Sequence, residues 1–92
     1  MNTTQTVLSS LALDLRRVAL GYHRGSNVMA ERFLEEALKR KDEINSLTVK
    51  PYIQRLLLKL APIRLEKDIQ KKAESALLYS ILFQNAATRY TA

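Results

Sequence analysis

The stretch QTVLSSLALDLRRVALGY, residues 5–22, repeats apolar side chains with the period of an α-helix. The repeat steps by three or four residues through Leu8, Leu11, Leu15 and Val18. Because residues at these steps share one side of a helix, the stretch predicts a helix with one buried face. Leu13 and Leu20 fall off this face, and we expect them to meet a partner or to lie exposed.

Two more helices are predicted downstream of this stretch. A second helix is predicted to reach about Ile44, with Ser26 or Asn27 as its N-cap. It turns a second set of apolar residues inward: Ala30, Phe33, Leu34, Ala37 and Leu38. Pro51 suits the first position of a third helix, where its missing N–H has no helical partner. Its predicted core face consists of Ile53, Leu56, Leu57 and Leu60.

The last helical segment, residues 63–90, has two characters. Its first half is amphipathic, with Leu65, Ile69, Ala73 and Ala76 predicted to turn inward. From Ala76 to Phe83 apolar residues surround the helix, which is typical of a central helix or of a subunit interface. Pro62 either ends the third helix or opens this one.

Size and composition agree with these segments. The chain has 92 residues, of which 47% are apolar, with only two glycines and two prolines. This composition favours a packed helical protein over a disordered chain. We therefore predict an all-α fold, a compact bundle of four or five helices, in a single domain covering residues 1–92. We expect no membrane span and no signal peptide, and a cytoplasmic location.

The inventory of reactive groups is thin, with one histidine and no cysteine. We predict that the chain is not an enzyme and uses no cofactor, no metal and no small-molecule substrate. His23 lies between Gly21 and Gly25, which predicts a position in a turn. Glu31 and Glu35 stand four apart, but di-metal bundles add Glu-x-x-His pairs that this sequence lacks.

Charge is divided unevenly along the chain, whose net charge is +6. No acidic residue occurs in residues 44–65. By contrast, the second helix pairs acids with bases four residues later, Glu35 with Lys39 and Glu36 with Arg40, which predicts local ion pairs. Residues 27–45 carry −1, so the rest of the chain carries +7.

The basic residues outside the second helix are the main candidates for binding a partner. Lysine and arginine on a rigid helix neutralise phosphates and release counterions, with little sequence preference. We predict backbone contacts to RNA or DNA, and the candidate residues are Arg16, Arg17, Arg55, Lys59, Arg64, Lys67 and Lys71. Lys50 points elsewhere on the helical wheel, and Lys72 belongs to the same unpaired basic set. Tyr52 adjoins Arg55 and Lys59 on the wheel and is a candidate for stacking on a base.

A basic stretch over residues 50–72, framed by the first helix and the apolar run from Ala76 to Phe83, resembles the small subunit of class 1 CRISPR effector complexes of the Cascade type. The resemblance rests on size, charge and helix pattern. It implies a non-catalytic subunit that stacks in several copies along a ribonucleoprotein complex and contacts guide RNA and displaced DNA.

A second resemblance points to another class of function. Residues 15–22, LRRVALGY, and residues 87–90, ATRY, are similar to the helical bundles that end the circadian-clock activator of cyanobacteria and begin a stress-response phosphatase. Those bundles dimerise and bind regulatory proteins. The alternative prediction is therefore a protein-interaction or dimerisation module that buries Ala76 to Phe83 against its partner.

Overall fold

The computed structural model describes residues 3–89, and within them it has four α-helices: α1 (Thr3–His23), α2 (Asn27–Asp42), α3 (Pro51–Leu58) and α4 (Ile69–Arg89). Two short 3₁₀ helices, η1 (Ser46–Thr48) and η2 (Ala61–Leu65), stand before and after α3. No strand occurs in this part of the chain. The structure confirms the predicted all-α bundle of four helices. The predicted end of the last helix at Tyr90 lies outside the described residues.

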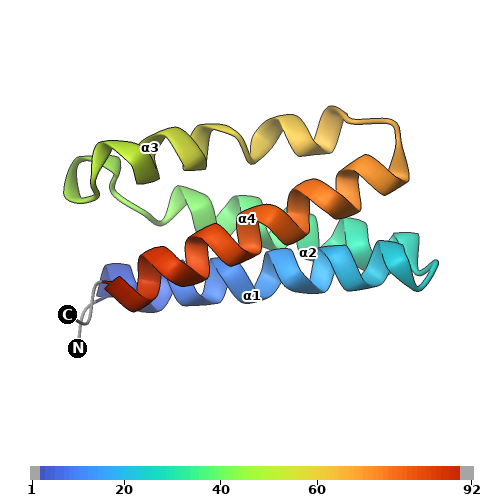
Figure 1. The fold of residues 1–92 in the computed structure, drawn as a ribbon, viewed down its shortest axis with the longest axis horizontal. Helices are drawn as coiled ribbons and strands as arrows, with labels where there is room; N and C mark the ends of the chain where they lie inside the picture. Colours follow the sequence, from blue (N-terminus) through green and yellow to red (C-terminus); the bar gives the residue numbers. More distant parts are fainter. Residues whose placement is uncertain (1–2, 90–92) are drawn as a thin grey trace.

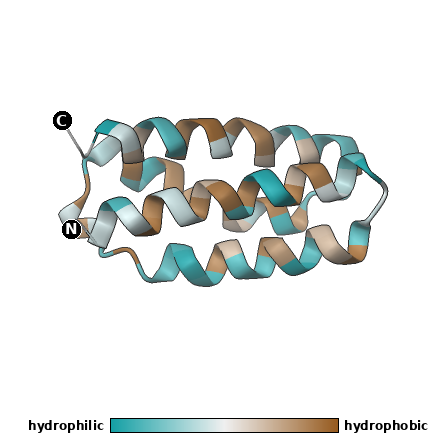
Figure 2. Cartoon of the chain, turned by 90° about the horizontal axis from the view of Figure 1, so that it is seen from below, coloured by the Kyte–Doolittle hydropathy of each residue, from teal (hydrophilic) through white to brown (hydrophobic). Residues whose placement is uncertain are grey.

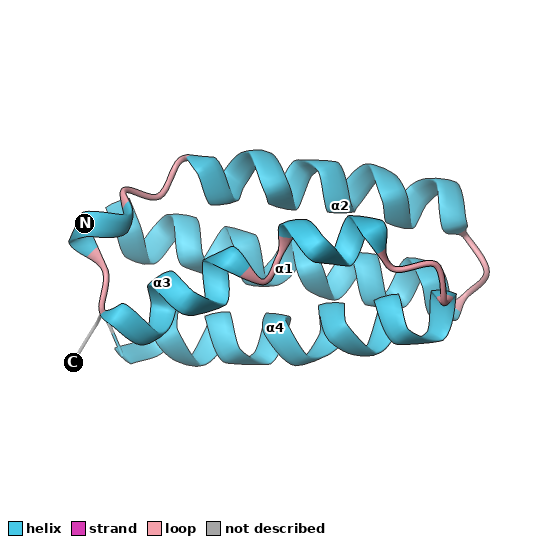
Figure 3. Ribbon diagram, turned by 90° about the horizontal axis from the view of Figure 1, so that it is seen from above, coloured by secondary structure: helices cyan, strands magenta, loops and turns pink. Residues whose placement is uncertain are grey.

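Helix α1 is the central element of the bundle. It makes its most extensive contacts with α4 and its next most extensive with α2. Figure 1 shows α1 and α4 running in opposite directions, with α2 behind them. Figure 3 shows α3 lying over the other helices. The radius of gyration is 12.5 Å, close to the roughly 12 Å expected of a compact chain of this length.

The core is built on the apolar face that the period of α1 predicted. Leu8, Leu11, Leu15 and Val18 are all fully buried. Phe83 of α4 and Leu34 of α2 are fully buried as well. Pro51 occupies the start of α3, as predicted. None of the described helices is both long enough and apolar enough to cross a bilayer.

The predicted last helix is broken, which changes the exposure of its first half. Residues 66–68 are not helical, so η2 and α4 are separate elements. The Asp68 carboxylate accepts hydrogen bonds from the backbone N–H groups of Gln70 and Lys71 at 2.9 and 3.3 Å and so caps the new start. The inward positions predicted for Leu65 and Ile69 are wrong, since they are 78% and 39% exposed.

Gly21 and Gly25 were predicted to bracket a turn that contains His23, but in the structure each glycine has a different role. Helix α1 continues through Gly21 to His23, so His23 is the last helical residue and does not lie in the turn. Gly21 lies where α1 approaches α2 closely, and a Cβ there would stand 2.9 Å from Cβ of Ala30. Gly25 has φ +77°, a conformation that favours glycine after a helix.

The ion pairs predicted within α2 do not form. Arg64 of η2 instead reaches Glu35 at 2.8 Å, and Arg40 donates to Asp14 of α1 at 2.9 Å. Glu36 pairs with Lys39 rather than Arg40, at 3.8 Å. Glu35 and Arg40 of α2 therefore pair with neighbouring elements, whereas Lys39 and Lys41 pair within the helix. The predicted pairs of Glu35 with Lys39 and of Glu36 with Arg40 are wrong.

Candidate nucleic-acid interface

The groove between α3 and α4 gathers basic and aromatic side chains from two distant parts of the sequence. The α3 side is lined by Tyr52, Arg55, Leu56 and Lys59. The α4 side is lined by Leu82, Asn85, Ala86 and Arg89. Both sets step by three, one and three residues, which places each set on one side of its segment. We call these eight residues the basic groove, whose volume is about 320 Å³.

Three cations of the basic groove are not neutralised. Arg55, Lys59 and Arg89 are exposed, and none has an ion pair within the described range 3–89. Of the described residues that line the groove, none is acidic. Unneutralised cations around a hollow create a positive potential that attracts a polyanion.

A neighbouring hollow extends the basic groove towards the start of α3. It is lined by Lys50 together with Tyr52 and Arg89, which also line the basic groove. Lys50, which was predicted to point away from Arg55 and Lys59, is the N-cap of α3 and lines this neighbouring hollow but not the basic groove. Tyr52 is half-buried, so its ring is held by packing at the junction of the two hollows. A ring held in this way beside cations suits stacking on an unpaired base.

The other predicted site residues are not brought into the basic groove. Arg16 and Arg17 lie on α1, where Arg17 is 5.4 Å from the centre of the Phe33 ring and 3.9 Å from Asp14. Arg64 is paired with Glu35. Lys67 lies in the non-helical residues 66–68, while Lys71 lies in the first turn of α4, and both are exposed. Contacts of these residues with nucleic acid stay a prediction.

The sequence had indicated that Lys72 belongs to an exposed basic surface, but the structure buries it. It is 6% exposed and donates to Glu31 of α2 at 2.9 Å, with its ammonium 5.5 Å from the centre of the Tyr22 ring. The Tyr22 hydroxyl donates to the same carboxylate oxygen of Glu31. This polar cluster ties α1, α2 and α4 together.

Each member of the polar cluster has a shifted pKa. Burial and the hydrogen bond to Glu31 raise the pKa of Tyr22. Hydrogen bonds from Tyr22 and Lys72 lower the pKa of Glu31. Burial acts to lower the pKa of Lys72, but Glu31 and Tyr22 together outweigh it and leave the pKa raised. These three pKa shifts keep Glu31 and Lys72 charged and the Tyr22 hydroxyl neutral. Such a cluster stabilises the fold and does not supply a reactive group.

Comparison with known proteins adds no assignment: no family model, curated protein or solved structure matches the chain. Within residues 3–89, no group of three or more His, Cys, Asp or Glu side chains is placed to hold a metal. The candidate site therefore rests on its own geometry.

Sequence reasoning missed Arg89 and Asn85 as members of the basic groove. They lie about thirty residues from Arg55 along the chain, and only the packing of α3 on α4 brings them together. The available signal was the matching spacing of residues 82, 85, 86 and 89 with residues 52, 55, 56 and 59. Equal spacing on two segments does not by itself say that the two sides face each other.

Proposed function

We propose that the chain binds nucleic acid through its phosphate backbone, without sequence preference and without catalysis, and that the basic groove is the site. The observation that carries this proposal is the convergence of Arg55, Lys59 and Arg89 beside Tyr52 in a hollow whose described lining has no acidic residue. Cations together with an aromatic ring are the usual composition of a site for single strands, where phosphates and bases are bound together.

Assignment to a ribonucleoprotein complex, as in the CRISPR small subunits that the sequence resembles, is part of this proposal. It is supported by the absence of a reactive constellation in the sequence and by the small size of the basic groove, which has room for a short stretch of strand. A subunit with such a site gains affinity when several copies bind one strand.

Salt-dependent binding tests the proposal. Fluorescence anisotropy with labelled single-stranded RNA, single-stranded DNA and duplex DNA is measured between about 50 and 300 mM salt. For single strands each neutralised phosphate contributes about 0.7 to the slope of log K against log salt. Three cations in the basic groove should therefore account for about 2 units of slope.

The decisive variant reverses the charge of Arg55, Lys59 and Arg89 to Glu. We expect it to abolish binding to single strands at low salt. A matched control reverses three exposed cations outside the groove, Arg24, Arg32 and Lys39. The control has the same net charge, so equal losses in both variants would show that total charge, and not the basic groove, drives binding.

A further inference from the structure

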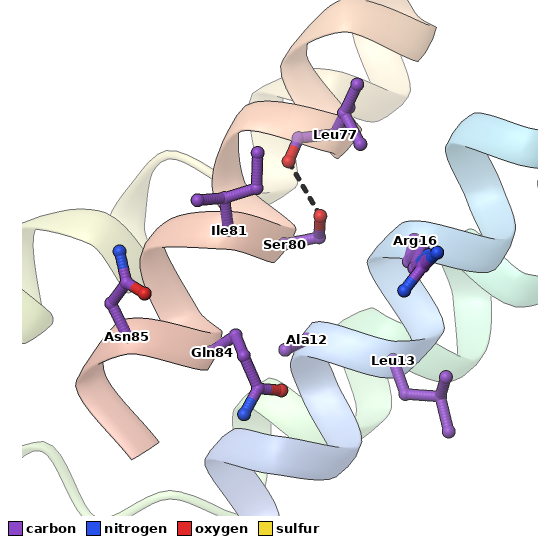
Figure 4. A pocket seen from close by; sticks show the side chains of 8 residues that line it. All are labelled: Ala12, Leu13, Arg16, Leu77, Ser80, Ile81, Gln84 and Asn85. Carbon is purple, nitrogen blue, oxygen red and sulfur yellow. Dashed lines mark hydrogen bonds between the residues drawn. The ribbon is translucent and has the colours of Figure 1, made fainter. Parts of the chain in front are cut away.

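A second groove lies on the other side of α4, between α4 and α1, and it differs in chemistry from the basic groove. On α1 it is lined by Ala12, Leu13 and Arg16. On α4 it is lined by Leu77, Ser80, Ile81, Gln84 and Asn85. Figure 4 shows these side chains on the two facing helices. We call these eight residues the apolar groove, whose volume is about 400 Å³. Asn85 lines both grooves.

Three large apolar side chains of this groove are only half covered. Leu13 is 47% exposed, Leu77 48% and Ile81 52%. They come from two helices that pack against each other, so they form one patch rather than scattered positions. Figure 2 shows the hydrophobic run in the middle of the helix that leads to the C-terminus. Contiguous exposed apolar surface of this kind marks an interaction site.

Arg16 is the only charged residue among the described lining of the apolar groove. It is exposed and has no ion pair within residues 3–89. The nearest acid along α1, Asp14, is 5% exposed and already accepts from Arg40. The apolar groove thus combines an apolar surface with a single unneutralised cation. A complementary occupant carries leucine-like side chains for the surface and a carboxylate for the cation.

We infer that the apolar groove binds an amphipathic helix of a partner protein, with its apolar side chains against Leu13, Leu77 and Ile81 and an Asp or Glu against Arg16. The hollow between two antiparallel helices accepts a third helix, whose contacting side chains are spaced i, i+3 or i+4, and i+7. This inference concerns a different surface from the basic groove and does not depend on the proposed function.

Charge separates this occupant from the two others that an exposed groove might receive. A two-fold dimer centred on this groove would bring two copies of Arg16 into one interface, with no acidic residue in the described lining to pair with either, in a chain of net charge +6. Nucleic acid needs repeated cations, and this groove has one. An acidic amphipathic helix has neither difficulty.

The experiment uses a displayed library of 18-residue peptides that keep Leu at i, i+4, i+7 and i+11 and vary the flanking positions among Glu, Lys and Gln. The full-length chain is the bait. We expect enrichment of Glu at flanking positions that reach Arg16, and an enriched peptide, labelled and measured by anisotropy, should bind at least about tenfold more weakly to the Arg16→Glu and Ile81→Asp variants. Selection on Arg16→Glu should favour Lys instead.

The matched control is Leu47→Asp, which changes an 89% exposed leucine of η1 outside both grooves and should leave peptide binding unchanged. Circular dichroism checks that each variant is folded. No enrichment of acidic peptides would overturn the inference. A dimer in sedimentation velocity that Ile81→Asp dissociates would assign the groove to a second copy, and loss of RNA binding in Arg16→Glu equal to that in Arg55→Glu would assign it to nucleic acid.

Discussion

The ion pair between Lys72 and Glu31 predicts unequal effects for two similar substitutions. The side chain of Lys72 is 8% exposed, whereas that of Glu31 is 45% exposed. In Glu31→Gln the ammonium stays buried without an anion. Losing a hydrogen bond between charged groups costs about 1.5–3 kcal/mol, and partial solvent screening of Glu31 places our expected loss at about 2 kcal/mol.

Replacing the buried partner instead should cost much less. In Lys72→Met an apolar side chain of similar length fills the buried position, while Glu31 keeps its contact with water and with the Tyr22 hydroxyl. Because an apolar residue removes the need to bury a charge, we expect a loss of less than about 1 kcal/mol. The double variant should resemble Lys72→Met, since no ammonium remains to be left unpaired.

Urea unfolding at pH 7, followed by circular dichroism with comparison of m-values, measures these differences. For a domain of this size a loss of about 2 kcal/mol lowers Tm by roughly 10 °C. The reasoning is refuted if Lys72→Met destabilises the chain as much as Glu31→Gln does. It is also refuted if the double variant is less stable than Glu31→Gln.

Three further predictions concern the helix contacts. Gly21→Ala should lower stability by about 1 kcal/mol in urea unfolding, because crowding against Ala30 exceeds the gain of roughly 1 kcal/mol in helix propensity; a stabilised variant would contradict this. Asp14→Asn should cost about 1 kcal/mol, and a double-mutant cycle with Arg40→Met should show coupling rather than additivity. The pKa of Glu31 is lowered in the folded state, so this carboxylate contributes stability above about pH 4.5 that is lost as pH falls through the folded-state pKa. Between pH 5 and 3 the Tm of Glu31→Gln should therefore fall less steeply than the Tm of the unchanged protein. Parallel curves of Tm against pH for the two proteins would contradict this prediction.

The helices that were predicted best are those whose apolar positions keep one period. In α1 a single stripe fixes which side is buried, and Leu8, Leu11, Leu15 and Val18 are fully buried. The same stripe contained a signal that was not used: Asp14 stands three residues after Leu11 and four before Val18, so it belongs to the buried side. A buried carboxylate needs a partner, and Arg40 supplies it.

Other features could not be predicted because they depend on how separate elements pack. Arg40 has an acid four residues before it, but the buried Asp14 of another helix gains more from its guanidinium than the exposed Glu36 does. Likewise, the period of residues 65, 69, 73 and 76 continues across residues 66–68, where the backbone leaves the helix. Hydropathy alone does not reveal such a break when the apolar period is unchanged on both sides of it.

The central place of α1 has a consequence for the order in which the chain can fold during synthesis. Its partner α2 follows at once, joined by the short turn around Gly25, so those two helices form local contacts early. Its main partner α4 is the last part of the bundle to be made. Until Ile69–Arg89 leaves the ribosome, the part of the apolar face of α1 that packs on α4 has no cover. Between the synthesis of α1 and that of α4 the nascent chain therefore carries a partly uncovered leucine stripe, and in this interval it is prone to aggregation or to capture by a chaperone.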